Sequence, residues 1–410
     1  MAGRTPPPHK ATTAHLQALY PLVGGRPLQA PGVYLGRDLH GGPFCFDPWE
    51  LYAAGVLTNP NLVVAGQIGK GKSTFVKTFV WRQLLFGRQA WVVDPKGEYG
   101  PLAEAAGSVP VRLRPGGAVR LNPLAGGPGG DTSGSRTELV SSVAASGLGR
   151  GLTPAERTAL ELAVWAAAGE RAEPTLPAVV DRLLEPDAAS AASVRTDRAG
   201  LAADGRTVAL ELRRLVRGDL AGLFDGPTSP GVRLDGHLVV LDLSALYDSP
   251  GLGILMTCAV AWLQAAVRRG DGAKRLVILD EAWAVLHDLG TARWLQASFK
   301  LARAHGVANL AVVHRLSDLR AAGSATSQQR LLAEGLLADS ETRVVFGQAP
   351  SESAAARDLL GLTGTEAALL CHLRRGVALW KVGDRSFLVE HAVAPSEAAL
   401  VDTDTAMVGS

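Results

Sequence analysis

Short, fully apolar runs alternate with longer helical stretches along most of the chain. Apolar runs without polar alternation are typical of strands buried on both faces, as in a parallel sheet covered by helices. The pattern predicts strands at 62–65, 90–93, 111–113, 238–243, 276–279, 310–313 and 344–346. It predicts helices over 72–85, 251–268 and 291–305. We therefore expect an α/β fold with a mostly parallel sheet.

The pattern changes at both ends of this region and once within it. Residues 1–30 are Pro-rich and aperiodic, which indicates a flexible tail, and short strand-like pieces follow. A Gly-rich loop at 125–135 opens a stretch without strand signals, which predicts an all-α insertion domain over 136–232. Within it, Thr153-Pro-Ala-Glu156 is typical of a helix start. The α/β pattern thus occupies 31–135 and 233–410, and it ends in a hairpin that turns at Gly383-Asp384.

Composition narrows the class of protein. The 410 residues carry 41 Lys and Arg against 39 Asp and Glu, which argues against a surface that binds nucleic acid throughout. The three cysteines lie far apart and form neither a zinc spacing nor a disulfide framework, so a reducing compartment is expected. The N-terminus lacks a secretory signal, and the apolar stretch 252–267 is shorter than a membrane span. We expect a cytoplasmic protein, with peripheral association at the inner face of the cell membrane left open.

A Gly-rich segment between the first apolar strand and the following helix fits GxxxxGK[ST]. Its glycines allow backbone N–H groups to form an anion nest, and the helix N-terminus adds its positive end. Lys72 is expected to reach the β- and γ-phosphates of ATP, and the Ser73 hydroxyl to ligate Mg²⁺. A chance match to a Gly-rich turn is the alternative, which the flanking elements disfavour. Nucleotide binding is therefore assigned to Gly66, Gly69, Lys70, Gly71, Lys72, Ser73 and Thr74.

Two adjacent acids, Asp280 and Glu281, end another apolar strand. The carboxyl end of this strand is expected beside the phosphate-binding loop, where Asp280 holds Mg²⁺ through water and Glu281 polarises the attacking water. Capping of the next helix is the alternative for the pair. The adjacent Glu favours a hydrolase over a kinase, so the sequence predicts a Mg²⁺-dependent ATPase.

Polar residues also follow two other strands. Asp94-Pro-Lys-Gly-Glu98-Tyr99 follows strand 90–93, and His314-Arg315 follows strand 310–313. Ligands gather at the carboxyl ends of parallel strands, so both segments are candidates to face the nucleotide. Turn and capping roles are the alternative for Asp94 and Glu98. A capping or loop role is the alternative for His314.

Together these motifs resemble the HerA–FtsK superfamily of ring ATPases, and within it they are most similar to the VirB/TraC-type ATPases of type IV secretion and conjugation. The resemblance rests on the phosphate-binding loop, DPKGEY, Leu121-Asn-Pro-Leu124, the helical insertion, LVILDEAW, Asp318-Leu319, Leu360-Gly-Leu-Thr363 and the final basic hairpin with Glu390. It implies a RecA-like P-loop NTPase core that the insertion divides into 31–135 and 233–410. It also implies a homo-oligomer, a hexamer with nucleotide at the subunit interfaces, that works with membrane components of a secretion channel on DNA or nucleoprotein.

Two departures from the family pattern matter. His314 stands where the family usually carries a Gln that is expected to sense the γ-phosphate, and we place it among the catalytic residues with Lys72 and Glu281. Only about sixty residues precede the phosphate-binding loop, so the docking functions of the usual first domain are expected on a separate protein.

A site between subunits requires an arginine from the neighbouring subunit. The candidates are Arg303, Arg315, Arg343, Arg374 and Arg375. We favour Arg343, because it begins a core strand.

Three functions stay open: a secretion or conjugation motor, a HerA/FtsK-like DNA translocase, and an ATP-dependent assembly scaffold with little turnover. Short basic clusters at 213–217 and 268–269 are the candidates for DNA contact, with solvated helix faces as the alternative.

Overall fold

The structure is a computed structural model that describes residue 28, residues 31–125 and most of 133–402. The internal gaps are 172, 219, 233–235, 248, 250–251, 268–271, 283–291, 293–294, 297–298, 301–304 and 315–333. The predicted tail therefore lies outside the described residues except for Leu28, and most of the predicted helix 291–305 does as well.

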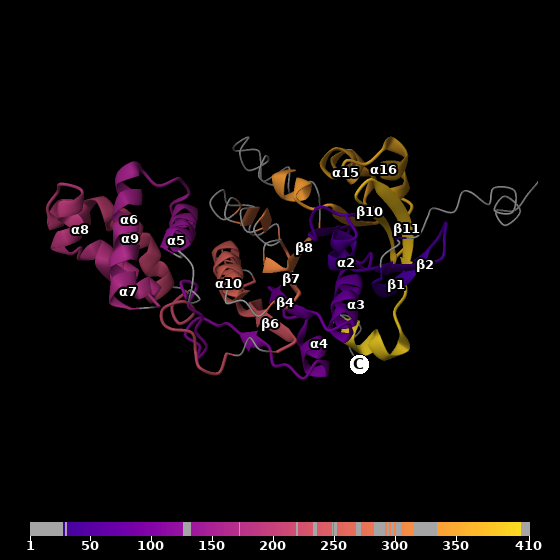
Figure 1. Cartoon of the computed structure of the whole chain (residues 1–410), viewed down its shortest axis with the longest axis horizontal. Coiled ribbons are helices and arrows are strands. Elements are labelled where there is room, and N and C mark those ends of the chain that lie inside the picture. The colour runs from indigo at the N-terminus through magenta and orange to yellow at the C-terminus, as the bar shows by residue number, and fades with distance from the viewer. Residues whose placement is uncertain are drawn as a thin grey trace, which may run out of the picture.

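An eleven-stranded sheet runs through the α/β part of the chain (Figure 1). Its order is β2-β1-β11-β10-β9-β3-β8-β7-β4-β6-β5. From β9 to β5 neighbouring strands pair in parallel, and from β2 to β9 they pair antiparallel. The strands are β1 Val33–Asp38, β2 Pro43–Phe46, β3 Leu62–Ala65, β4 Gln89–Asp94, β5 Val111–Arg112, β6 Leu238–Asp242, β7 Arg275–Leu279, β8 Val307–Val313, β9 Thr342–Phe346, β10 Val377–Val382 and β11 Arg385–His391.

Helices connect and cover these strands. They are α2 Pro48–Ala53, α3 Lys72–Leu85, α4 Gly100–Ala105, α5 Ser133–Leu148, α6 Pro154–Glu170, α7 Leu176–Leu184, α8 Ala188–Ser193, α9 Arg198–Arg217, α10 Leu252–Val267, α15 Ser353–Leu360, α16 Gly364–Leu370 and α17 Ala398–Val401. No helix in the described part of the chain is both long and apolar enough to cross a membrane.

The sheet is buried on both faces, which explains why its strands read as continuous apolar runs. In β3, Val63 and Ala65 belong to the core cluster that also contains α10, whereas Leu62 and Val64 belong to the cluster that contains Phe75 and Phe79 of α3. Successive side chains of a strand point to opposite faces, so each face of β3 contributes to a separate core. Packing on both faces holds β3 in place, and this fixes the point at which the phosphate-binding loop begins.

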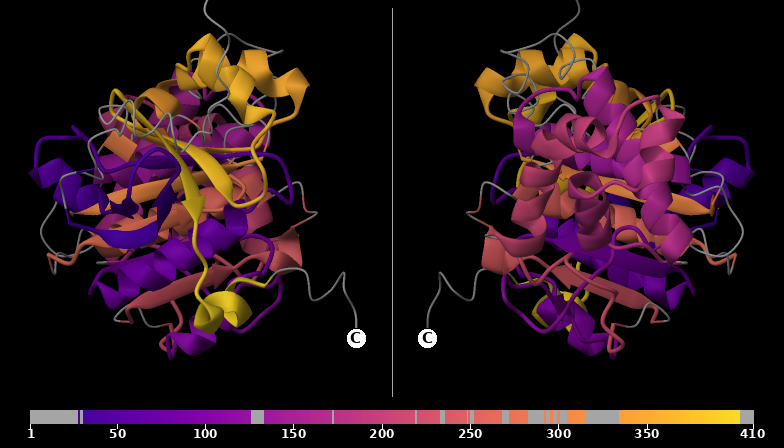
Figure 2. Two further views of the ribbon diagram at one scale, coloured as in Figure 1. Left: turned by 90° about the vertical axis from the view of Figure 1, so that its right-hand side faces the viewer. Right: turned by 90° about the vertical axis from the view of Figure 1, so that its left-hand side faces the viewer.

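The described residues of the insertion form helices joined by turns and loops, and none of them belongs to a strand. Helices α5 to α9 group beside the sheet, with α10 between this group and the strands (Figure 1), and seen from that side the group lies in front of the sheet (Figure 2, right). The predicted start of α6 is confirmed: Thr153 N donates to the Glu156 carboxylate at 2.8 Å, and Glu156 N donates to Thr153 Oγ1 at 3.3 Å. The first helix begins at Ser133, three residues before the predicted boundary. The division into domains stays a prediction.

Most other predicted elements are confirmed within one or two residues, including the final hairpin with its turn at Gly383-Asp384. Strand β8 differs, because it begins at Val307 rather than at residue 310. The extra residues pair with β7, where Arg275 stands opposite Val307, so pairing extends the strand beyond its apolar run. The three cysteines are free.

Candidate nucleotide-binding and catalytic site

The phosphate-binding loop connects β3 to α3 and is built for close backbone approach. Gly69 and Gly71 have φ values of 77° and 105°, which side-chain-bearing residues rarely adopt. A Cβ on Gly66 would lie 2.6 Å from Phe346 Cβ, and one on Gly71 would lie 3.3 Å from the nitrogen of Gly376. Backbone conformation thus favours glycine at all three positions, and at Gly66 the space next to Phe346 also excludes a side chain.

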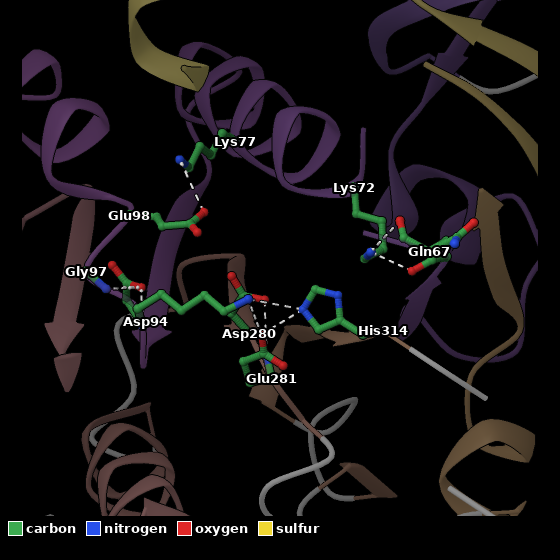
Figure 3. Close-up of polar contacts among 11 residues, drawn as sticks. Gln67, Lys72, Lys77, Asp94, Gly97, Glu98, Asp280, Glu281 and His314 are labelled. Carbon is green, nitrogen blue, oxygen red and sulfur yellow. Dashed lines mark hydrogen bonds and ion pairs between the residues drawn. The ribbon is translucent and has the colours of Figure 1, made fainter. Parts of the chain in front are cut away.

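The side chain of Lys72 lies across this loop. Its Nζ donates to the carbonyl oxygens of Gly66 at 2.5 Å and Gln67 at 3.0 Å (Figure 3). Lys72 is only 4% exposed, and burial lowers its pKa to about 8, with Asp280 acting in the opposite direction. Ser73 follows it in the first turn of α3 and is partly buried, as is Thr74. The carbonyl of Lys70 accepts a 3.0 Å hydrogen bond from the nitrogen of Gly376, which ties the loop to the start of β10.

Asp280 and Glu281 follow the last residue of β7 and are 4% and 1% exposed. Burial and the neighbouring carboxylate of Glu281 raise the pKa of Asp280 to about 7. Glu281 has a φ of 56°, an uncommon conformation for a residue other than glycine. Strand β8 pairs with both β3 and β7 and so lies between them. Asp280 is nevertheless close enough to the phosphate-binding loop for its charge to raise the pKa of Lys72, which agrees with the expected position of this carboxylate.

The intervening strand brings His314 to the site. Parallel strands end at one edge of the sheet, and His314 follows β8 there, between Glu281 and Lys72 (Figure 3). His314 Nε2 donates to Glu281 Oε1 at 2.6 Å. The side chain of Lys96 forms an ion pair with the same carboxylate oxygen, and its Nζ lies 3.2 Å from His314 Nε2. Residues from three neighbouring strand ends therefore meet on one carboxylate.

The charge state of Glu281 follows from these contacts. Burial alone would raise its pKa, but the hydrogen bonds and charges of His314 and Lys96 outweigh burial and lower the pKa to about 2. Glu281 is therefore ionised throughout the neutral range. For Lys96, burial acts to lower the pKa, yet the contact with Glu281 raises it, so this lysine stays protonated.

Asp94 organises the loop that carries Lys96. Its carboxylate is fully buried and accepts hydrogen bonds from the backbone nitrogens of Lys96 at 3.1 Å, Gly97 at 2.9 Å and Tyr99 at 3.0 Å. Burial raises the pKa of Asp94, and these backbone donors oppose that effect. The geometry favours the turn role for Asp94. In the same loop, Glu98 pairs at 3.8 Å with the buried Lys77 of α3 (Figure 3).

Arg343, the favoured arginine finger, does not fit that role. It lies near the amino end of β9, opposite Val63 of β3. Its guanidinium donates to the carbonyl oxygens of Leu360 at 2.9 Å and Leu337 at 3.3 Å, and burial lowers its pKa. These bonds fix Arg343 within its own subunit, and we correct the assignment to a structural role.

Of the four other arginine candidates, Arg374 and Arg375 belong to the described residues. Arg303 and Arg315 lie outside the described residues, as does the basic pair 268–269. Arg374 pairs with Glu390 at 2.5 Å, in the segment that reaches the phosphate-binding loop through the nitrogen of Gly376. On α9, Arg214 pairs with Glu211 at 2.9 Å in an exposed contact, which agrees with a solvated helix face.

The donors at the site fit a magnesium nucleotide. Among the described residues there is no group of three or more His, Cys, Asp and Glu side chains that could enclose a metal ion. Mg²⁺ at phosphate sites is commonly held by one or two protein oxygens together with the phosphates and water. The Ser73 hydroxyl and the Asp280 carboxylate match that requirement.

Sequence comparison gives one curated relative. TraC of Escherichia coli (strain K12) is 27% identical over 319 residues, which is 75% of this chain and 35% of TraC. The chain thus spans about a third of the length of this relative. The chain is homologous to TraC. The predicted resemblance to the VirB/TraC-type ATPases is confirmed. No family model matches the chain.

Solved structures show the fold. VirB4 of Thermoanaerobacter pseudethanolicus superposes on this chain with a TM-score of 0.73 at 21% identity. The superposition covers 90% of this chain and 98% of the VirB4 chain. The plasmid coupling protein TrwB in complex with ADP and Mg²⁺ gives a TM-score of 0.55 at 15% identity, over 94% of this chain and 93% of that chain. The predicted α/β fold with a RecA-like P-loop core is therefore confirmed.

Proposed function

We propose that this TraC homologue is a Mg²⁺-dependent ATPase that energises type IV secretion or conjugative transfer of DNA or protein across the cell envelope. The observation that carries the proposal is the arrangement of Lys72, His314 and Glu281 along one edge of the sheet, with Glu281 ionised. The similarity to TraC and VirB4 supports the transport role.

Each residue of the site has a task in hydrolysis. The backbone nitrogens of the loop would bind the phosphates, and Lys72 Nζ would exchange its two carbonyl acceptors for phosphate oxygens. Ser73 and Asp280 would hold Mg²⁺, which when bound neutralises phosphate charge. With a pKa of about 2, Glu281 is a weak base, so its main contribution is to accept a hydrogen bond from the attacking water and orient it.

The proposed assembly is a hexameric ring bound at the inner face of the cell membrane to components of a secretion channel. An arginine from a neighbouring subunit would complete each site. The alternative of a HerA/FtsK-like DNA translocase requires a basic pore, and the pairing of Arg214 with Glu211 gives it no support. An assembly scaffold with little turnover is the remaining alternative.

Two substitutions separate binding from hydrolysis. Lys72→Ala removes the buried ammonium of the loop and is expected to abolish ATP binding. Glu281→Gln keeps the shape but not the charge, and is expected to bind ATP while turnover falls at least about a hundredfold. Binding is measured by calorimetry and turnover by phosphate release, with Lys274→Ala as a control because its pair with Glu50 lies at the opposite edge of the sheet.

The same assays distinguish the three functions. Wild-type turnover in either Lys72→Ala or Glu281→Gln would contradict the site assignment. When turnover is measured with and without DNA, turnover that requires DNA would favour the translocase. Turnover that is indifferent to DNA but rises steeply with protein concentration would favour the secretion motor. ATP binding without turnover in the wild type would favour the scaffold.

A further inference from the structure

We propose that Lys96 is a positioning residue that holds the carboxylate of Glu281 in the orientation required for hydrolysis. This inference rests on the proposed ATPase function. It gives the DPKGEY loop a second role besides forming a turn. The loop places the positive charge of Lys96 next to the buried carboxylate of Glu281.

Two donors converge on one oxygen of Glu281. His314 Nε2 donates to Oε1 at 2.6 Å, and the ammonium of Lys96 pairs with the same atom. Because an ionised carboxylate only accepts hydrogen bonds, both neighbours must be donors to it. Two directional contacts on one oxygen fix the plane of the carboxylate, and that plane determines where a water molecule can be held.

Glu281 needs such support for two reasons. It is 1% exposed, and a buried charge is strongly unfavourable unless a partner of opposite charge is present. Its φ of 56° is also a sparsely populated conformation, which persists only where surrounding contacts impose it. The Lys96 ammonium provides a full positive charge next to the buried carboxylate of Glu281.

The loop that carries Lys96 is itself well fixed. Asp94 accepts three backbone hydrogen bonds within it, and Gly97 has a φ of 72°, which only glycine adopts readily. Glu98 ties the loop to Lys77 of α3, the helix that begins at the phosphate-binding loop. Lys96 is therefore delivered from a rigid segment that contacts both the nucleotide-binding helix and the catalytic strand.

The first experiment tests the contact without nucleotide. Thermal midpoints are measured for the full chain with Lys96→Met, with Glu281→Gln and with both substitutions. Loss of Lys96 leaves the charge of Glu281 buried with one partner fewer, so the midpoint is expected to fall by about 2–4 °C. In the Glu281→Gln background no charge needs compensation, and the added loss is expected below about 1 °C. Equal losses in both backgrounds would overturn the proposal.

The second experiment separates positioning from mere stabilisation. Under conditions where every variant is folded, Lys96→Met is expected to lower kcat about a hundredfold and to leave the Kd for ATP within about threefold. Lys96→Arg keeps the charge and is expected to recover at least about a third of the lost activity on a logarithmic scale. Lys274→Met is the matched control, since it removes a lysine that pairs with Glu50 at 3.5 Å on the opposite edge.

The outcomes also distinguish this inference from the proposed function. Wild-type kcat in Lys96→Met, with an active wild-type chain, overturns the role of Lys96 alone. No ATP turnover in the wild-type chain overturns both, because there is then no hydrolysis for Lys96 to support. A lower kcat together with an equally lower ATP affinity would assign Lys96 to nucleotide binding and would also overturn positioning.

Discussion

The two ring nitrogens of His314 differ in their hydrogen bonds. Its Nε2 donates to Glu281, while Nδ1 is buried without a hydrogen-bond partner among the described residues. A buried polar atom without a partner is unfavourable, so a ligand or water is expected there. With Nε2 donating, Nδ1 of the neutral ring is an acceptor, and the ring lies between Glu281 and Lys72 (Figure 3), so a water that donates to Nδ1 would lie toward the phosphate end of the site. We therefore expect His314 to connect the phosphate end of the site with the catalytic carboxylate.

Substitutions of His314 test this connection. Glutamine retains an N–H donor for Glu281, so His314→Gln is expected to keep turnover within about tenfold of the wild type. Alanine removes the donor, and His314→Ala is expected to lower turnover about a hundredfold. ATP affinity should stay within about threefold in both, because neither substitution touches the loop. Single-turnover hydrolysis and calorimetry provide the measurements, and wild-type turnover in His314→Ala would contradict the assignment.

Individual site residues were predictable where a motif fixes them to the backbone. Lys72 and Ser73 begin the helix that follows a loop whose conformation the glycines determine, and Asp280 and Glu281 follow an apolar strand. The contact of Lys96 with Glu281 was not predictable, because it depends on which strand ends are neighbours. The choice of Arg343 failed because the sequence gives no local signal of the carbonyl oxygens of Leu337 and Leu360 that bind its guanidinium.

Secondary-structure elements were predicted better than their arrangement. β3 and α3 have the predicted bounds, because an apolar run ends at glycines and a helical pattern starts at Lys72. The order of strands depends on side-to-side pairing, of which the chain sequence carries no local signal. The position of β8 between β3 and β7 is the consequential example, since it places His314 inside the site.

The hairpin of β10 and β11 contains a histidine that should make stability depend on pH. His391 is partly buried, its ring packs against Phe75 and Phe346, and its Nε2 accepts a 3.0 Å hydrogen bond from Trp380 Nε1. Burial lowers its pKa to about 3, from an ordinary value near 6.5. In the unfolded chain this histidine takes up a proton as the pH falls through about 6.5. In the folded chain it stays neutral until about pH 3.

As the pH falls from 6.5 toward 3, His391 is expected to remove about 1.4 kcal/mol of stability per pH unit. His391→Gln does not titrate and retains an acceptor for Trp380, so its stability should fall less steeply over the same range. Urea unfolding of both chains at pH 7.5, 6 and 5 measures the difference. Parallel pH dependence in the two chains would show that His391 is not buried in its neutral form.

At the scale of the whole molecule, two of the arginine candidates are engaged within the chain. Arg343 is bound to carbonyl oxygens, and Arg374 is paired with Glu390. The proposed ring would supply an arginine from a second subunit to stabilise charge on the transferred phosphate. An arginine finger supplied by a neighbour contributes about a thousandfold or more to turnover.

ATP turnover per chain is therefore expected to depend on protein concentration. Across the range in which monomers assemble, followed by sedimentation or light scattering, turnover per chain should rise at least about tenfold, because only assembled subunits receive the neighbour's arginine. Arg343→Lys should lower the thermal midpoint but keep the same dependence on concentration, since that residue acts within its own subunit. Lys72→Ala chains added to wild-type chains near the transition should restore turnover in their wild-type neighbours, because they still supply an arginine. Constant turnover per chain in monomer and oligomer would contradict a shared site and would mean that one chain contains every group that hydrolysis needs.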